Sequence, residues 1–207
     1  MSDRAEFPAA PPLRVAQWFN SKQAITLDEL RGKVVLVHTF QMLCHACVMH
    51  ATPQAVRLWQ HYREDGNNNV VVLGLHTVFE HHDVMTPAAL AVYLYEFRVP
   101  FPVGVDMAGI GDPIPQTMRD YHTQGTPTTL LIDGAGRLRK HHFGLESDQQ
   151  LIADIDYLRW KISRRRRTGA HQLPAHGIRD GLDDQGARGP ALGERPWFAA
   201  PGRDARG

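Results

Sequence analysis

Two cysteines three residues apart are the residues of this sequence best suited to chemistry. Cys44 and Cys47 are the only cysteines among 207 residues; they follow a valine-rich segment and precede an amphipathic one. At the start of a helix, unpaired backbone N–H groups and the helix dipole favour the thiolate of the first cysteine. We therefore expect Cys44 to attack a disulfide, and Cys47, one turn later and more buried, to resolve the mixed disulfide.

A metal site is the alternative for the same residues. Cys44, Cys47 and His50 could form half of a zinc site, but structural zinc usually takes four ligands, and the chain has no second cysteine pair. Thiolates and imidazoles also suit copper, for which three further histidines are candidates: His76, His81 and His82. A c-type haem is excluded because Val48 stands where its motif requires histidine. The dithiol chemistry itself needs neither a cofactor nor a metal.

The elements around the pair predict alternating strands and helices. Nearly continuous apolar runs predict buried strands at residues 33–40, 70–76 and 99–106. Apolar residues at spacings of three and four predict helices at residues 48–62, 86–97, 114–121 and 147–162. Two further β-prone runs around a glycine-containing turn predict a hairpin at residues 128–133 and 138–143. This order predicts an α/β sheet with helices on both faces, with Trp59, Phe143 and Trp160 in its core.

Composition divides the chain into three parts. Residues 1–12 are expected to be a flexible N-terminus, residues 13–163 the folded domain, and residues 164–207 a disordered tail. The tail holds nine Arg and five acidic residues, hence a charge of +4, with eight Gly and four Pro. Its four arginines at 164–167 could touch nucleic acid or acidic lipid, but such runs are more often solvated chain after a helix. A nucleic-acid partner is therefore not expected.

The apolar segments are too short to cross a membrane. The longest aliphatic stretches, residues 34–37 and 70–75, are of strand length and fall far short of the roughly 20 residues a membrane helix needs. Residues 1–13 contain no apolar signal segment. We therefore expect no membrane span and a cytoplasmic location.

The chain resembles the thioredoxin superfamily, in particular the redoxin branch of TlpA-like thiol-disulfide reductases and peroxiredoxin-like proteins. The resemblance covers about residues 13–160 and rests on residues 27–39, on the cysteine pair, and on Gly125-Thr126-Pro127-Thr128 before a strand. It implies a thioredoxin-like fold with a central mixed sheet. It also implies thiol-disulfide exchange with a disulfide-containing protein or a small thiol, served by an electron donor that the sequence does not identify.

The resemblance further implies roles for single residues. The Thr126–Pro127 bond should be cis and should present backbone to the substrate beside the cysteines. His45 could stabilise the Cys44 thiolate or simply face solvent. His38 stands where many thioredoxins carry a buried acid, so it is either a base for Cys47 or a core histidine. Glu80, after the second strand, is either a catalytic acid or a plain loop carboxylate.

Departures from the family pattern leave the direction of electron flow open. The pair encloses His45-Ala46 and follows Leu43, where relatives often have proline inside the pair and tryptophan before it. Peroxiredoxins carry proline and threonine where this chain has Val37 and Gln41, so hydroperoxide reduction is an alternative without its usual residues. In a reducing cytosol the pair would rest as a dithiol, which favours reductase chemistry.

Overall fold

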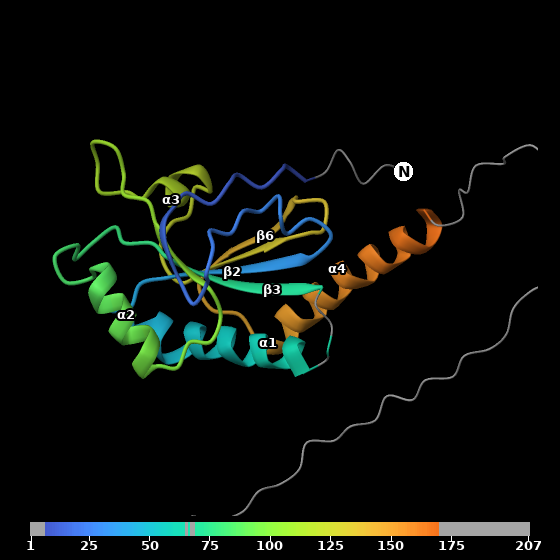
Figure 1. Cartoon of the computed structure of the whole chain (residues 1–207), viewed down its shortest axis with the longest axis horizontal. Helices are drawn as coiled ribbons and strands as arrows, with labels where there is room; N and C mark the ends of the chain where they lie inside the picture. Colours follow the sequence, from blue (N-terminus) through green and yellow to red (C-terminus); the bar gives the residue numbers. More distant parts are fainter. Residues whose placement is uncertain (1–6, 65, 67–68, 170–207) are drawn as a thin grey trace, which may run out of the picture. The chain divides into compact units, whose positions relative to one another are not determined.

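A six-stranded sheet forms the centre of the computed structural model, which describes residues 7–64, 66 and 69–169 (Figure 1). In the order in which they pair, the strands are β1 (Val15–Phe19), β4 (Val103–Asp106), β3 (Val70–His76), β2 (Val34–Phe40), β5 (Thr128–Ile132) and β6 (Leu138–Phe143). Strands β2, β3 and β4 are parallel, whereas β1 and β5 run antiparallel to their inner neighbours and β6 runs antiparallel to β5. The expected mixed sheet is confirmed.

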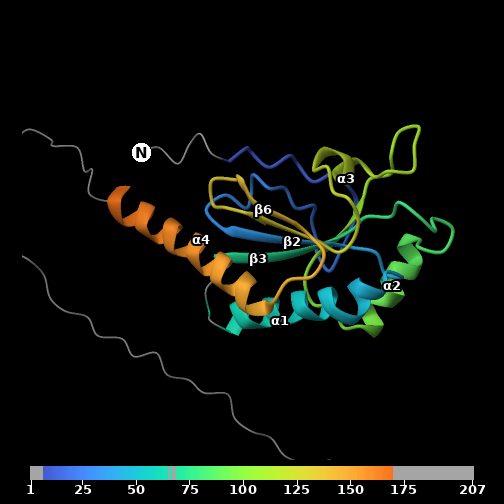
Figure 2. The ribbon, with the colours of Figure 1, turned by 180° about the vertical axis from the view of Figure 1, so that it is seen from behind.

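Three helices cover one face of the sheet, and the N-terminal chain and a short helix cover the other (Figure 2). The helices are α1 (Thr52–Glu64), α2 (Pro87–Glu96), α3 (Gln116–Asp120) and α4 (Asp148–Gly169), and a π-helical turn, η1 (Cys47–Ala51), leads into α1. The core under α1, α2 and α4 is the larger of two, and the opposite core packs against Tyr121, next to α3. None of the described helices is long and apolar enough to cross a membrane.

Strand β2 lies between the two cores and carries the cysteine loop. All seven of its residues are buried. Leu36 and Phe40 pack in the core under the helices, and Val35 and Val37 pack in the opposite core, as the period of two in a strand requires. The loop that follows Phe40 therefore starts from a position fixed on both sides.

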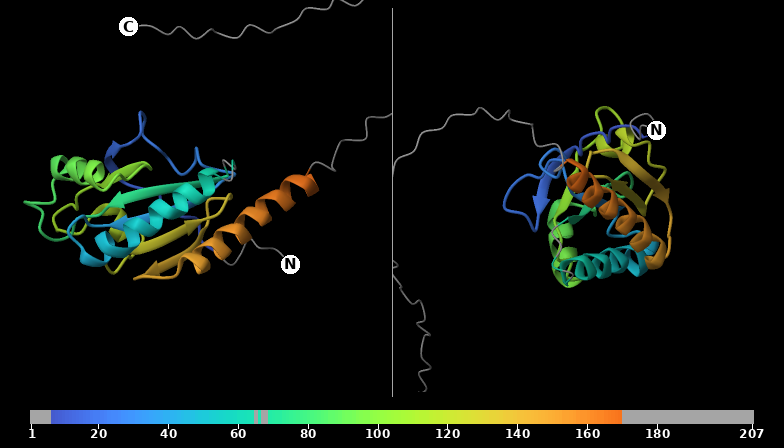
Figure 3. Two further views of the ribbon diagram at one scale, coloured as in Figure 1. Left: turned by 90° about the horizontal axis from the view of Figure 1, so that it is seen from below. Right: turned by 90° about the vertical axis from the view of Figure 1, so that its right-hand side faces the viewer.

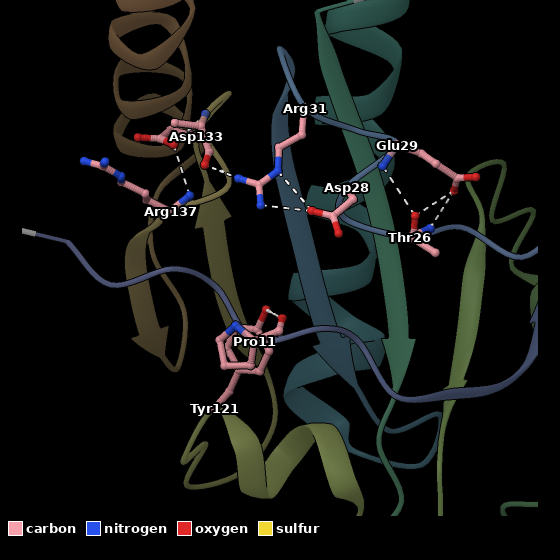
Figure 4. A network of polar contacts seen from close by, with 9 residues as sticks. Pro11, Thr26, Asp28, Glu29, Arg31, Tyr121, Asp133 and Arg137 are labelled. Atoms are coloured by element: carbon pink, nitrogen blue, oxygen red, sulfur yellow. Dashed lines mark hydrogen bonds and ion pairs between the residues drawn. The ribbon is translucent and has the colours of Figure 1, made fainter. Parts of the chain in front are cut away.

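The N-terminal chain and the β5–β6 hairpin are joined at the far end of β2. Arg31, just before β2, pairs with Asp28 at 2.9 Å and donates to the carbonyl of Ala135 in the hairpin turn (Figure 4). Towards the other end of β2, the Tyr121 hydroxyl holds the N-terminal chain by donating to the carbonyl of Pro11 at 2.6 Å (Figure 4). The N–H of Ala10 also donates to the carbonyl of Gly136 at 3.0 Å. The sequence predicts that the folded domain starts at residue 13, but Ala10 is already hydrogen-bonded to the domain.

The largest differences from the prediction are two element boundaries and one whole strand. β4 begins at Val103 instead of residue 99, because Pro100 and Pro102 have no N–H to donate to a neighbouring strand. The final helix continues to Gly169 instead of residue 162, and the rest of the predicted tail, residues 170–207, lies outside the described residues. Strand β1 was not predicted.

The three aromatic residues predicted for the core differ in burial. Phe143 and Trp160 are each 48% exposed, so their assignment to the core was wrong. Phe143 lies on β6 at the edge of the sheet, and Trp160 lies on the outer side of α4. Trp59 is half-buried and packs against the core under the helices, as expected.

Candidate active site

The cysteine pair lies where the chain leaves β2 and enters a helix. Cys44 is half-buried, Cys47 is fully buried, and both are reduced. The N–H of Cys44 donates to the carbonyl of Gln41 at 3.1 Å, and the N–H of Val48 donates to the carbonyl of Cys44 at 3.0 Å. The N–H of Cys47 donates to Cys44 Sγ at 3.4 Å. This backbone donor is directed at the sulfur that we expect to be the nucleophile.

A π-helical turn shapes the start of the helix that bears Cys47. It spans Cys47–Ala51, and the N–H of Thr52 donates to the carbonyl of Cys47, five residues earlier. Pro53 follows at once; it has no N–H to donate and its ring crowds the preceding turn. Such single wide turns relieve this crowding and occur frequently at functional sites.

A second loop lies against Cys44. The Thr126–Pro127 bond is cis, which confirms the expectation, and the Cys44 thiol donates to the carbonyl of Thr126 at 3.5 Å. The loop is held on both sides, because Thr128 Oγ1 donates to the carbonyl of Gly125 at 2.8 Å and the N–H of Gly144 donates to the carbonyl of Pro127 at 2.9 Å. The expected neighbours Cys44, Thr126 and Pro127 are therefore brought together.

The two cysteines differ in their surroundings as the mechanism requires. Burial, and after it the neighbouring Cys44 side chain, raise the pKa of the Cys47 thiol to about 12, although the backbone of Gln41 and the side chain of Thr126 act to lower it. Cys47 therefore stays protonated at neutral pH until something favours its thiolate. This behaviour suits a resolving cysteine, which acts only after the mixed disulfide has formed.

His38 lies deep below the pair and contacts a hydroxyl. Its Nε2 is 3.0 Å from Thr52 Oγ1, and its ring stacks on Phe40 with centroids 5.2 Å apart. Burial lowers the pKa of His38 to about 3, so the ring is neutral near pH 7. The hydrogen bond of His38 is with Thr52 at the start of α1 and not with Cys47. A role for His38 as a base for Cys47 therefore stays a prediction.

Glu80 reaches the cysteine loop through another side chain. Gln41 is buried three residues before Cys44, and its Nε2 donates to Glu80 Oε1 at 3.4 Å. Glu80 is otherwise exposed in the loop after β3. Sequence reasoning found Glu80 but missed Gln41, which was considered only as a departure from the peroxiredoxin pattern. His45 is exposed between the two cysteines.

Tyr93 of α2 is a further site residue that sequence reasoning missed. It is 8% exposed and packs in the same core as Cys47. Burial raises the pKa of its hydroxyl, and the charges of Cys47 and Cys44 raise it further, whereas the Thr52 hydroxyl lowers it. The tyrosine thus shares the buried environment of both sulfurs. Only the helical period of residues 86–97 hinted that Tyr93 faces the core.

The histidines proposed as copper ligands do not gather around the cysteines. His76 is buried at the end of β3 with neither ring nitrogen hydrogen-bonded, and burial lowers its pKa to about 4. His81 and His82 are exposed in the following loop. Within residues 7–64, 66 and 69–169, no three His, Cys, Asp or Glu side chains are grouped so that they could hold a metal ion. The copper hypothesis therefore finds no ligand set there.

A dithiol pair at a helix start, facing a cis-proline loop on a mixed sheet, defines a thioredoxin-fold dithiol protein. The comparisons with known proteins agree, and the chain belongs to the thioredoxin-like superfamily. A solved thioredoxin-like superfamily protein is 52% identical, with a TM-score of 0.69, over 72% of this chain and 95% of its own. A solved thiol-disulfide isomerase from Corynebacterium glutamicum is 46% identical, with a TM-score of 0.67, over 72% of this chain and 96% of its own.

A curated relative matches only in part. Protein DipZ of Mycobacterium tuberculosis is 30% identical over 138 residues, which are 65% of this chain and 18% of DipZ. The chain therefore spans less than a fifth of the length of that relative. No family model matches the chain.

Proposed function

We propose that this chain is a thiol-disulfide oxidoreductase that exchanges electrons between Cys44 and Cys47 and a disulfide-containing partner. One observation carries the proposal, the arrangement of the two sulfurs. Cys44 Sγ accepts the N–H of Cys47 at 3.4 Å and lies 3.5 Å from the carbonyl of Thr126, and the Cys47 side chain is fully buried. The membership of the thioredoxin-like superfamily supports it, as does the 46% identity to a protein named a thiol-disulfide isomerase.

The exchange proceeds in two balanced steps when the dithiol is the reductant. The Cys44 thiolate attacks one sulfur of the partner disulfide, forms a mixed disulfide and expels the other sulfur as a thiolate. Cys47 then loses its proton and attacks Cys44 Sγ, which forms the Cys44–Cys47 disulfide and expels the second partner thiolate. Two electrons pass to the partner, and an external dithiol must later return them.

An exposed apolar rim around the pair suits a polypeptide partner. Four large apolar side chains that are 48% to 60% exposed make up the rim: Leu43, Met49, Phe143 and Leu145. Leu43 adjoins Cys44, and Met49 and Leu145 line one open depression of about 240 Å³. The Phe143 ring lies against Gly125 of the cis-proline loop. Such a rim favours a protein disulfide over glutathione as substrate.

A redox titration tests the proposal. The purified chain is equilibrated in glutathione buffers of graded potential, its free thiols are alkylated, and they are counted by intact mass. We expect one two-electron transition between dithiol and intramolecular disulfide, and the Cys47→Ser variant should accumulate mixed disulfides. Thiols that resist alkylation until a chelator is added would overturn the proposal in favour of a metal ligand role.

The midpoint of the same titration decides the direction of exchange. A potential near that of thioredoxin, roughly −270 mV, indicates a reductase, and one near −120 mV indicates an oxidant. The cytoplasmic location expected from the sequence stays a prediction, and in that compartment the reducing direction is favoured.

A further inference from the structure

The C-terminal half of α4 carries aromatic and basic side chains on one outer face. Three of these side chains, Trp160, Lys161 and Arg164, come three, four and seven residues after Tyr157. All four therefore share one side of the helix. Tyr157 and Trp160 are about half exposed. The apolar side of the same helix, which includes Leu151, Ile155 and Leu158, is buried against the sheet. The outer face is therefore not needed for the core.

The charge of this segment has one sign. Residues 157–167 contain six cations and no carboxylate: Arg159, Lys161, Arg164, Arg165, Arg166 and Arg167. Arg159 is tied to Asp156 at 2.8 Å and faces Tyr62, so it belongs to the body of the domain. The helix backbone continues through the last three arginines to Gly169. A surface of this kind attracts an anionic partner.

The aromatic pair distinguishes a lipid surface from a nucleic acid. Tyr157 and Trp160 stack on each other with centroids 6.1 Å apart. Lys161 lies 4.9 Å from the Tyr157 ring and Arg164 5.0 Å from the Trp160 ring. Each ring thus already contacts the other ring and one cation, which leaves less of its face open for stacking on nucleic-acid bases. Tyrosine and tryptophan beside several cations are instead typical of side chains at a membrane interface.

We propose that the end of α4, with Tyr157, Trp160, Lys161 and Arg164 on its outer face and the basic residues 165–167 after them in sequence, binds the surface of membranes that contain anionic lipids. The lipid headgroups would meet the lysine and arginines, and the edges of the two rings would enter the interfacial region. The end of α4 and the loop after β2 lie at opposite ends of the sheet (Figures 1 and 3). A chain bound in this way keeps Cys44 directed away from the bilayer and open to a partner. The proposal does not depend on the redox function.

Sedimentation of the full chain with vesicles tests the proposal. Vesicles of equal parts phosphatidylglycerol and phosphatidylcholine are compared with pure phosphatidylcholine. We expect binding to the anionic vesicles alone, weakened as salt rises from about 0.05 to about 0.5 M. A variant with Arg164, Arg165, Arg166 and Arg167 changed to Gln should bind at least about tenfold more weakly.

Two matched controls separate this face from net charge and general hydrophobicity. Changing four dispersed arginines, Arg179, Arg188, Arg195 and Arg203, to Gln removes the same charge and should leave most of the binding. Trp160→Ala should weaken binding several-fold, and Trp197→Ala should not. Cooperative urea unfolding of each variant serves as the check that the domain is folded.

Three results would overturn the proposal. The first is equal sedimentation with neutral and anionic vesicles, or none with either. The second is an equal loss of binding in the clustered and the dispersed arginine variants. The third is binding of a single-stranded oligonucleotide that depends on residues 164–167 while anionic vesicles are ignored, which would assign the face to nucleic acid.

Discussion

Gln41 links Glu80 to the cysteine loop. Its side-chain amide donates to the Glu80 carboxylate at 3.4 Å, and its main-chain carbonyl accepts the N–H of Cys44 at 3.1 Å. The contact joins the loop after β2 to the loop after β3. These loops meet at the carboxyl edge of the parallel strands, where open α/β sheets gather their reactive groups. The carboxylate is thus bonded to the loop that carries Cys44, although it lies far from that loop in the sequence.

We expect Glu80 to accept the proton that Cys47 loses when it resolves the mixed disulfide. Glu80→Gln should slow that step by about tenfold or more at pH 7, since the amide keeps the contact with Gln41 but cannot take a proton. Asp83→Asn, an exposed change in the same loop, is the control and should have no effect. Stopped-flow release of a chromophoric thiol bound to Cys44 measures the rate. Equal effects of the two substitutions would remove Glu80 from the mechanism.

The resolving step should depend on pH through Cys47 itself. Burial raises its pKa to about 12, so its thiolate fraction grows about tenfold for each pH unit below that value. In the Glu80→Gln variant, whose side chain cannot take the proton, we expect release of the thiol bound to Cys44 to accelerate nearly tenfold for each pH unit, or about a hundredfold between about pH 7 and pH 9. Cys47→Ser should give no release at any pH. A flat rate profile in the Glu80→Gln variant would show that proton loss from Cys47 does not limit resolution.

Much of the fold follows from local pattern. The apolar run of β2, the cysteine pair after it and the glycine-containing turn of the β5–β6 hairpin are each visible within a short window of sequence. The cap of α2 is equally local, since Thr86 accepts the N–H of Ala89 at 3.3 Å and Pro87 follows it. These features were predicted with nearly the correct bounds.

Other features depend on contacts between distant segments, and local pattern could not supply them. Strand β1 exists because it pairs with β4, about 90 residues later along the chain. Gln41 becomes a site residue only when the loop after β2 meets the loop after β3, and Tyr93 only when helix α2 packs in the core that contains Cys47. The extension of α4 has a different cause: arginine is a good helix former, so residues 164–167 prolong the helix although their charge suggested a solvated tail.

Acid should destabilise the domain partly through His76. Burial lowers its pKa to about 4. Between about pH 6.5 and pH 4 this histidine is therefore protonated in the unfolded chain but neutral in the folded chain, so the free energy of unfolding falls as the pH drops. The loss at pH 5 should be about 2 kcal/mol. Urea unfolding at pH 7 and pH 5 measures it. His76→Phe should shrink the difference between the two pH values, whereas His141→Phe at an exposed site should not.

The comparison of the native chain with His76→Phe also tests whether His76 is the group that titrates. Since neither nitrogen of His76 has a hydrogen-bond partner, the phenylalanine variant loses no bond to a described residue. The relevant quantity is the difference in the free energy of unfolding between pH 7 and pH 5, because a change in packing alters the free energy equally at both pH values. An unchanged difference in the His76→Phe variant would show that this histidine titrates normally or does not contribute.

Partner selection should depend on the apolar rim rather than on the reacting atoms. Leu43→Ser and Phe143→Ser remove exposed apolar surface beside Cys44 and the cis-proline loop, where both side chains are about half exposed or more. We expect each to lower kcat/KM for a protein disulfide several-fold and to leave the exchange with glutathione unchanged. Ile110→Ser, at an 80% exposed site in another loop, is the matched control. Loss of both activities together would indicate that the substitutions disturb the cysteines, and loss of neither would place the partner elsewhere.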